Sequence, residues 1–184
     1  RAGGRNRLDA RRIPQRGIVG GTGPDSSVRA RAGPTSTLAS ASMELSCAFA
    51  PRPDLPELVA HAEQLGYTRA WVYDSPALYG DVWMSLARCA DRTSTIGLGP
   101  AVLVPSLRHP MVNAAAIATL EQLAPGRTAV ALGTGFTGRY VLGQQPMTWA
   151  ATEQYLSQLI GLLRGEVVVI DGAPTEMIHP EGYV

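Results

Sequence analysis

One stretch of the sequence, residues 95–110, constrains the fold more than any other. It reads TIGLGPAVLVPSLRHP, an apolar run that is punctuated by prolines and followed by an alanine-rich helical pattern. The run is apolar at successive positions, which is typical of a buried strand in a parallel sheet. Because helices cover both faces of such a sheet, ligands bind beyond the carboxyl ends of its strands. We therefore expect functional residues at positions 101–106.

From Met43 onward the chain alternates strand and helix patterns. Predicted strands cover residues 43–49, 69–73, 95–104 and 128–132, and predicted helices cover residues 54–65, 81–93, 110–124 and 148–164. A hairpin is expected after them, because Asp171-Gly172 supplies the positive φ that a two-residue turn needs. Four successive strand–helix units predict an α/β fold with a parallel sheet.

The predicted helices carry recognisable boundary signals. Asp54, with Glu57 three positions later, is an acidic variant of the capping box, and Thr148 is expected to cap the last helix. The first helix is expected to bury one apolar face, which consists of Leu55, Leu58, Val59, Ala62 and Leu65.

Residues 1–42 differ in composition from the rest of the chain. They hold eight Arg against two Asp, whereas residues 43–184 hold eight Arg against 13 acidic residues. The segment is rich in Gly, Pro and Ser, a composition that cannot bury enough surface to offset its ordering entropy. We predict a disordered leader followed by one domain, residues 43–184. A nucleic-acid arm or a transit peptide is the alternative, but dispersed arginines favour a leader outside the native coding sequence, with Met43 as the start.

Several classes of site have no support in the sequence. Cys47 and Cys89 lie in apolar patterns without CxxC spacing, which indicates reduced thiols in a cytoplasmic protein. No apolar run approaches the ~20 residues of a membrane span. His61, His109 and His179 lack the spacing of metal ligands. We therefore predict no metal, membrane or nucleic-acid partner.

Residues 133–138, GTGFTG, match the GxGxxG pattern of dinucleotide-binding sites. That pattern should open a helix at once and be followed ~20 residues later by an acidic residue at the end of the next strand. Here Pro146 intervenes, and Glu153 lies inside the predicted last helix. The context therefore disfavours a Rossmann site.

The order of motifs also resembles a known family. GPAVLVPSLRHP, an alanine-rich helix, Gly-Arg and a strand that ends in GTG resemble the third and fourth βα units of the bacterial-luciferase-like flavin and deazaflavin oxidoreductases. The resemblance extends from Met43 to the end of the chain. It implies a partial (β/α)8 TIM barrel, namely the first four βα units plus a β-hairpin, and a homodimer for a full-length protein.

The resemblance implies site residues at the ends of two strands. Asp74 ends the second strand, where the family commonly carries an acidic residue near the reactive edge of the cofactor ring, so it is the candidate catalytic and cofactor-binding residue. A carboxylate at a barrel mouth is expected to be too exposed for a core position. Thr134 and Gly135 are cofactor-binding candidates, because the family's Thr-Gly pair contacts the ring there.

The third strand is expected to back the ring with a bulge. By the resemblance, the Ala101–Val102 peptide bond is a non-proline cis bond, and both residues contact the cofactor. Val104 stands where a relative has a Thr that touches the cofactor, so one hydrogen bond is missing here.

Two departures from the family narrow the activity. Its sugar-phosphate dehydrogenases place a His directly after the Asp and a Glu after the Thr-Gly pair, whereas this chain has Ser75 and Phe136. Sugar-phosphate oxidation is therefore not expected. The Arg108-His109-Pro110 segment is expected to fasten the loop before the third helix rather than to perform acid–base chemistry.

The resemblance predicts an oxidoreductase that binds coenzyme F420 and transfers a hydride to or from a small organic substrate. F420 is favoured because Asp74, AVLVP and GTG together resemble that branch. The alternatives are an FMN-dependent monooxygenase and a non-catalytic remnant of the same fold. With four of eight barrel units and no phosphate-binding loops from the second half, this chain is expected to be a poor catalyst on its own.

Overall fold

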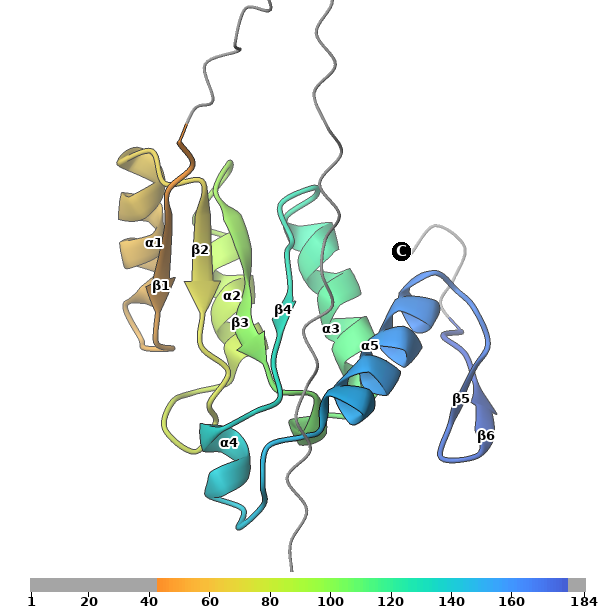
Figure 1. Ribbon diagram of the computed structural model, residues 1–184. Helices are drawn as coiled ribbons and strands as arrows, with labels where there is room; N and C mark the ends of the chain where they lie inside the picture. Colours follow the sequence, from red (N-terminus) through yellow and green to blue (C-terminus); the bar gives the residue numbers. More distant parts are fainter. Residues whose placement is uncertain (1–42, 179–184) are drawn as a thin grey trace, which may run out of the picture. The chain divides into compact units, whose positions relative to one another are not determined.

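The computed structural model describes residues 43–178 of the 184-residue chain. The predictions for the leader, residues 1–42, and for His179 lie outside the described residues. The elements are, in chain order, β1 (Ser46–Phe49), α1 (Leu55–Gln64), β2 (Arg69–Val72), α2 (Val82–Ala90), β3 (Gly97–Leu103), the short 3-10 turn η1 (Pro105–Leu107), α3 (Pro110–Leu123), β4 (Ala131–Leu132), α4 (Thr137–Tyr140), α5 (Trp149–Leu163), β5 (Val168–Ile170) and β6 (Ala173–Thr175) (Figure 1).

The main sheet has the order β1-β2-β3-β4, and each neighbouring pair is parallel. Successive strands lie side by side and are connected by helices, which confirms the predicted run of βα units. Alternate residues of the strands, such as Ala70, Val72 and Leu98, pack against α1, α2 and α3 in one hydrophobic core. On the other face, the Arg69 guanidinium lies 5.2 Å from the ring centre of Trp71.

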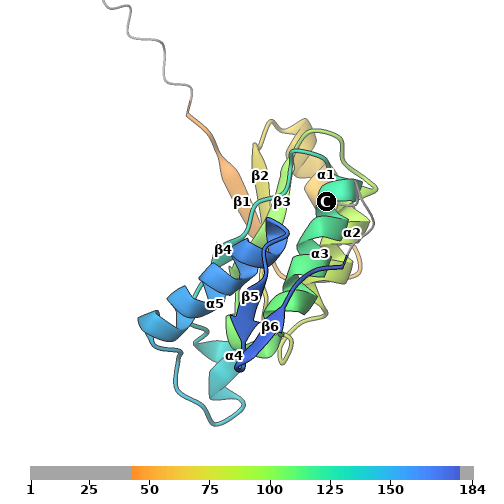
Figure 2. The ribbon, with the colours of Figure 1, turned by 90° about the vertical axis from the view of Figure 1, so that its right-hand side faces the viewer.

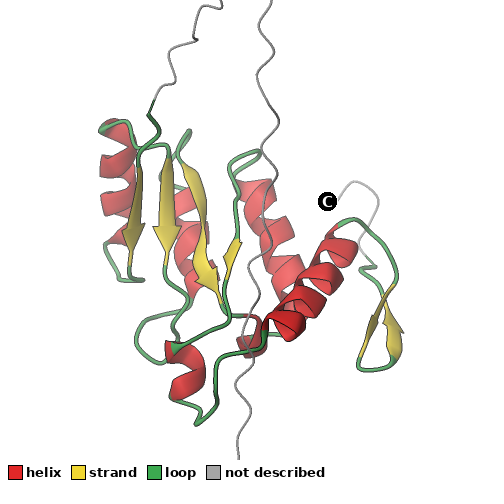
Figure 3. Cartoon of the chain, in the orientation of Figure 1, coloured by secondary structure: helices red, strands yellow, loops and turns green. Residues whose placement is uncertain are grey.

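The fourth strand is shorter than the predicted range of residues 128–132. Figure 3 shows β4 as a short strand. Thr128 makes only an isolated bridge with Leu98, the ladder resumes at Ala131, and its register shifts between Ala101 and Leu103 of β3. The cause is Pro100 in β3, which has no N–H to continue the ladder that the Leu98 and Ala129 amides begin. The interruption lies directly before the end of β3, where functional residues were expected.

The predicted hairpin is present as β5 and β6. Ile170 pairs with Ala173, and the two turn residues, Asp171 and Gly172, have φ values of 51° and 81°. Two positive φ values define the type of turn that matches the twist of a hairpin. The hairpin packs on α5, which itself packs beside α3 (Figure 2). A second apolar cluster joins them, formed by Ala114, Tyr155, Leu159, Leu162 and Ile170.

The helix-end predictions were right in one case and wrong in another. Thr148 caps α5 by accepting a hydrogen bond from the Ala151 amide. Asp54 precedes α1 but makes no cap, because its carboxylate pairs with the neighbouring Arg52 guanidinium instead. The predicted apolar face is also one residue too long: Leu65 lies beyond the helix and is exposed.

Glu63 fastens α1 to the loop before β3. Its Oε1 accepts hydrogen bonds from the amides of Ser94, Thr95 and Ile96, at 2.9, 2.6 and 2.9 Å, and from the Thr95 hydroxyl at 2.9 Å. Burial alone would raise the pKa of Glu63, but these hydrogen bonds outweigh it and lower the pKa to about 2. The carboxylate thus fixes the start of the strand that leads to the candidate site.

We expect Glu63→Gln to lower the free energy of unfolding at pH 7 by about 2 kcal/mol, the scale of hydrogen bonds to a charged group. The folded-state pKa lies below the ordinary value of 4.5, so the contribution is complete above pH 4.5 and is lost as the pH falls toward 2. Urea denaturation at pH 7, 4 and 3 measures it. Equal losses from Glu63→Gln at pH 7 and pH 3 would contradict the assignment.

Candidate functional site

A pocket opens at the carboxyl ends of β2, β3 and β4. Its volume is about 190 Å³. The lining residues follow β2, end β3 or belong to the loop after β4, and they are Tyr73, Asp74, Ser75, Ala101, Val102, Val104, Gly135, Phe136, Thr137 and Gly138. The pocket therefore lies at the edge of the sheet where a parallel α/β fold leaves its loops free to bind a ligand.

The pocket brings together all but one of the residues that the sequence singled out. Asp74, Ala101, Val102, Val104 and Gly135 all belong to its lining. The exception is Thr134, which does not line the pocket. Its carbonyl oxygen accepts a hydrogen bond from the Met147 amide at 2.9 Å. That backbone bond closes the loop after β4, which carries the lining residue Gly135.

Asp74 is buried, contrary to the expectation that a carboxylate at this end of the sheet would be exposed. Its side chain is 1% exposed. One Arg108 nitrogen, Nη1, donates to both carboxylate oxygens at 2.9 Å, and the Val104 amide donates to Oδ2 at 3.1 Å. A buried carboxylate needs such partners, because an unpaired buried charge is costly. Asp74 thus ties the end of β3 to the end of β2.

Arg108 is the residue of this site that the sequence analysis assigned only to loop fastening. Its second terminal nitrogen, Nη2, donates to Asp81 at 2.9 Å, so one guanidinium bridges two carboxylates. Burial would raise the pKa of Asp81, but hydrogen bonds from the Met84 amide, Arg108 and the Trp83 amide outweigh it and lower the pKa. The sequence did offer a signal for this ion pair: Arg108 follows β3 and Asp74 follows β2, and these two strands are neighbours in the sheet.

The loop-fastening role predicted for the same segment is confirmed for His109. Its Nδ1 accepts a hydrogen bond from the Met111 amide at 3.2 Å, and Pro110 occupies the first turn of α3. His109 therefore caps a helix, and it does not belong to the pocket lining.

A chain of three hydrogen bonds, buried or partly buried, joins three helices to this loop. The Trp83 indole donates to Asn113 at 3.0 Å, Asn113 donates to the Tyr155 hydroxyl at 2.7 Å, and that hydroxyl donates to the Arg108 carbonyl at 3.0 Å. Burial raises the pKa of Tyr155, so the phenol stays protonated and remains a donor. The backbone of Arg108 is thus held from α2, α3 and α5.

The wall formed by β3 has the local geometry that the resemblance implied. The Ala101–Val102 peptide bond is cis. Beside it, the loop after β4 approaches closely: a Cβ at Gly135, whose φ is 76°, would lie 2.4 Å from Val104 Cγ1, and one at Gly133 would lie 2.7 Å from Val102 Cγ2. Glycine is required at these two positions so that the loop can close over the wall.

The loop after β4 contains a helix that the sequence did not predict. α4 is only four residues long, and both Phe136, which precedes it, and Tyr140, which ends it, are 73% exposed. Their ring planes lie 13° apart with centres separated by 6.4 Å. So short a helix is not the long helix that a dinucleotide-binding motif opens, which agrees with the rejection of a Rossmann site.

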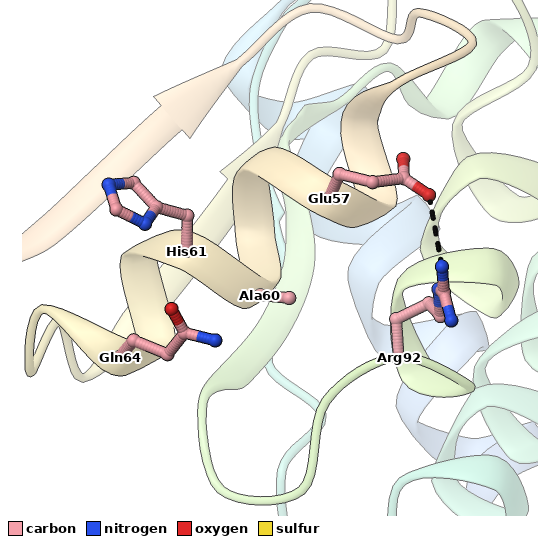
Figure 4. Close-up of a pocket in the computed structure, with 5 residues that line it drawn as sticks. All are labelled: Glu57, Ala60, His61, Gln64 and Arg92. Atoms are coloured by element: carbon pink, nitrogen blue, oxygen red, sulfur yellow. Dashed lines mark hydrogen bonds and ion pairs between the residues drawn. The ribbon is translucent and has the colours of Figure 1, made fainter.

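A second pocket lies elsewhere on the surface. Glu57, Ala60, His61 and Gln64 of α1 line it together with Arg92, which pairs with Glu57 at 3.4 Å (Figure 4). Both members of this pair are more than half exposed, and such pairs contribute little. The pocket holds no buried polar group, so we assign no chemistry to it.

Two kinds of feature are absent from the described part of the chain. Within residues 43–178 no helix is both long and apolar enough to span a membrane. In the same range no three side chains of His, Cys, Asp or Glu are grouped so that they could hold a metal ion.

Comparisons with known proteins agree on one family. The family model described as luciferase-like monooxygenase matches residues 28–179. Among curated proteins, the 5,10-methylenetetrahydromethanopterin reductase of Methanolobus tindarius is 32% identical over 117 residues, which make up 60% of this chain and 34% of that protein. The chain therefore spans about a third of the length of this relative.

Solved structures show the same fold. The coenzyme F420 dependent tetrahydromethanopterin reductase from Methanopyrus kandleri superposes with a TM-score of 0.62 at 24% identity, over 73% of this chain and 45% of that one. The FMN complex of the oxygenating constituent of 3,6-diketocamphane monooxygenase from Pseudomonas putida superposes with a TM-score of 0.61 at 18% identity, over 76% and 44%. With the family match, the parallel sheet and the site at its carboxyl edge, the chain belongs to the luciferase-like monooxygenase family.

Proposed function

We propose that the pocket at the carboxyl ends of β2, β3 and β4 holds the ring of coenzyme F420, and that the protein transfers a hydride to or from a small organic substrate. The observation that carries the proposal is the convergence of Asp74, Ala101, Val102, Val104 and Gly135 on one pocket. A curated relative is a reductase, and a solved relative is described as F420 dependent.

The residues of the pocket fit a flat ring. Val102 is 45% exposed although it lies on β3, so it offers an apolar surface to a ligand. Gly135 leaves out the side chain that would otherwise meet Val104. The volume, about 190 Å³, is below the roughly 300–1,000 Å³ of pockets that enclose whole ligands. The described residues therefore suit the ring of a cofactor rather than all of it.

Each side chain has a definite task in this proposal. The cofactor would supply the hydride chemistry, and the protein would supply position and exclusion of water. Val102 and Val104 form the apolar wall against which the ring lies. Asp74 acts as a positioning residue, because its carboxylate holds the Val104 amide and is itself held by Arg108. Thr134 closes the loop that carries Gly135.

The second candidate function is an FMN-dependent monooxygenase of the same family. It is favoured by the similarity to a solved monooxygenase that contains FMN. A non-catalytic remnant of the fold is the third possibility from the sequence. The homodimer and the cytoplasmic location that the sequence analysis predicted stay predictions.

Titration of the chain with F420 and with FMN, followed by cofactor fluorescence, tests the proposal. Tighter binding of F420 is the expected result, and tighter binding of FMN would favour the monooxygenase. Absence of binding by either cofactor would show the proposal to be wrong for this chain. Binding of F420 without any hydride exchange with candidate substrates would favour a non-catalytic protein.

We expect Val102→Glu to weaken F420 binding at least ten-fold, because it places a charge against the apolar wall where a ring would be buried. The matched control is Val112→Glu, which introduces the same charge at a position on α3 that is 55% exposed and outside the pocket lining. Thermal melting establishes that both variants are folded. Equal affinity of the two folded variants for F420 would place the ring elsewhere.

A further inference from the structure

Aromatic side chains gather in and beside the lining of the pocket, and we define this aromatic rim as Tyr73, Tyr79, Phe136 and Tyr140. Tyr73 and Phe136 line the pocket, and each is paired with a second aromatic ring at a centre-to-centre distance of 6.4 Å. The two pairs come from different loops, after β2 and after β4. Exposed apolar groups that gather at one opening are characteristic of ligand and interaction sites.

The charged groups next to the pocket, Asp74, Asp81 and Arg108, carry a net negative charge. Arg108 is shared between Asp74 and Asp81, so one positive group faces two carboxylates. Among the described residues that line the pocket there is no Arg, Lys or His. An anionic group placed against this lining would lose hydration without gaining an ion pair from it, which is unfavourable. Arg139, the cation on the loop that carries Phe136, donates to the Gln145 carbonyl.

We propose that the rim selects an uncharged aromatic substrate, which stacks on Phe136 while the inner pocket holds the cofactor ring. This inference rests on the proposed function, because it assigns the inner pocket to the cofactor. The inner volume of about 190 Å³ cannot enclose two ring systems together, since a single ligand site typically takes roughly 300–1,000 Å³. The substrate must therefore lie at the opening, where the aromatic side chains are exposed.

The chemistry of the rim supports stacking rather than polar recognition. Phe136 has no polar atom in its side chain, and 73% of it is accessible. Aromatic side chains contribute large apolar contact areas together with a preference for offset or edge-to-face partners. An apolar surface of this kind discriminates weakly between neutral molecules of similar size, whereas it rejects charged ones strongly. The rim thus favours substrates that are uncharged and planar.

The test uses three probes: 2-acetylnaphthalene, which is a neutral aromatic ketone, 2-naphthoate, which is its anionic counterpart, and glucose 6-phosphate. Each is titrated by NMR into the full chain, both free and saturated with F420. We expect 2-acetylnaphthalene to bind at least ten-fold more tightly than 2-naphthoate and glucose 6-phosphate not to compete. Phe136→Ala should weaken 2-acetylnaphthalene about ten-fold, or ~1.4 kcal/mol, and Phe136→Tyr should restore it.

The control is Trp149→Ala, which removes an aromatic side chain that is 78% exposed and outside the pocket lining. Trp149→Ala should leave the affinity for 2-acetylnaphthalene unchanged and the affinity for F420 within two-fold of that of the unsubstituted chain. Equal binding of the neutral and anionic probes, or an unchanged affinity in Phe136→Ala, would overturn the inference even if F420 binds as proposed. Failure of F420 to bind would instead reject the proposed function, and the probe titrations on the free chain would still decide the role of Phe136.

Discussion

Replacing Gly99 with alanine is expected to destabilise the fold by roughly 3 kcal/mol or more, enough to unfold a marginally stable domain. A Cβ at this position would lie 1.6 Å from the Ala129 carbonyl oxygen and 2.7 Å from its carbonyl carbon. Both atoms belong to the backbone, so no side chain can turn away to make room. Circular dichroism and urea denaturation of Gly99→Ala measure the effect.

Gly80→Ala is the matched control. Its added Cβ would meet only Pro51 Cβ, at 3.9 Å, which is an ordinary contact. We expect its unfolding free energy to stay within about 0.5 kcal/mol of the unsubstituted chain, as for most surface substitutions. If Gly99→Ala proved as stable as Gly80→Ala, the close passage of the segment before β4 over β3 would be wrong.

Replacing Arg108 with methionine is expected to cost about 3–5 kcal/mol, the scale of breaking one partner from a buried ion pair. The substitution keeps much of the apolar stem but leaves Asp74, whose side chain is 1% exposed, with only the Val104 amide as a hydrogen-bond donor. It also removes the contact with Asp81. Denaturant unfolding measures the loss.

Two further variants separate this effect from the loss of any arginine. Arg164→Met changes an exposed position at the end of α5 and should alter stability by less than about 0.5 kcal/mol. The double variant Asp74→Asn with Arg108→Met removes both charges and should recover part of the loss. Additive losses in that double variant would show that the two side chains act independently.

Local patterns in the sequence predicted much of the fold. The apolar run of residues 95–104 became β3, and Asp171-Gly172 became the hairpin turn, because the chemistry of each is decided by the residues themselves. The effect of one residue on another was harder to predict. Asp54 had the right position for a cap, but Arg52 bound its carboxylate. Pro100 was visible in the sequence, yet its effect on β4 depends on which strand lies beside it.

The candidate site was predicted less fully than the fold. Asp74, Val102, Val104 and Gly135 meet at one pocket, which follows from their positions after neighbouring parallel strands. The burial of Asp74 could not be read from its position, because it depends on Arg108, 34 residues later in the chain. Ion pairs between residues far apart in the chain follow no sequence periodicity, so the hydrogen bonds that tie Asp74 to Arg108 and to the Val104 amide became apparent only from the structure.

The hydrogen bonds from Trp83 through Asn113 and Tyr155 to the Arg108 carbonyl have a consequence for protein engineering. A library aimed at new selectivity would ordinarily vary only the side chains around the opening. Here Asn113 and Tyr155 govern where the Arg108 backbone lies, although neither belongs to the pocket lining. Small changes on α3 and α5 can therefore shift Arg108 and, through its guanidinium, the lining residue Asp74, so these two positions belong in the first round of such a library.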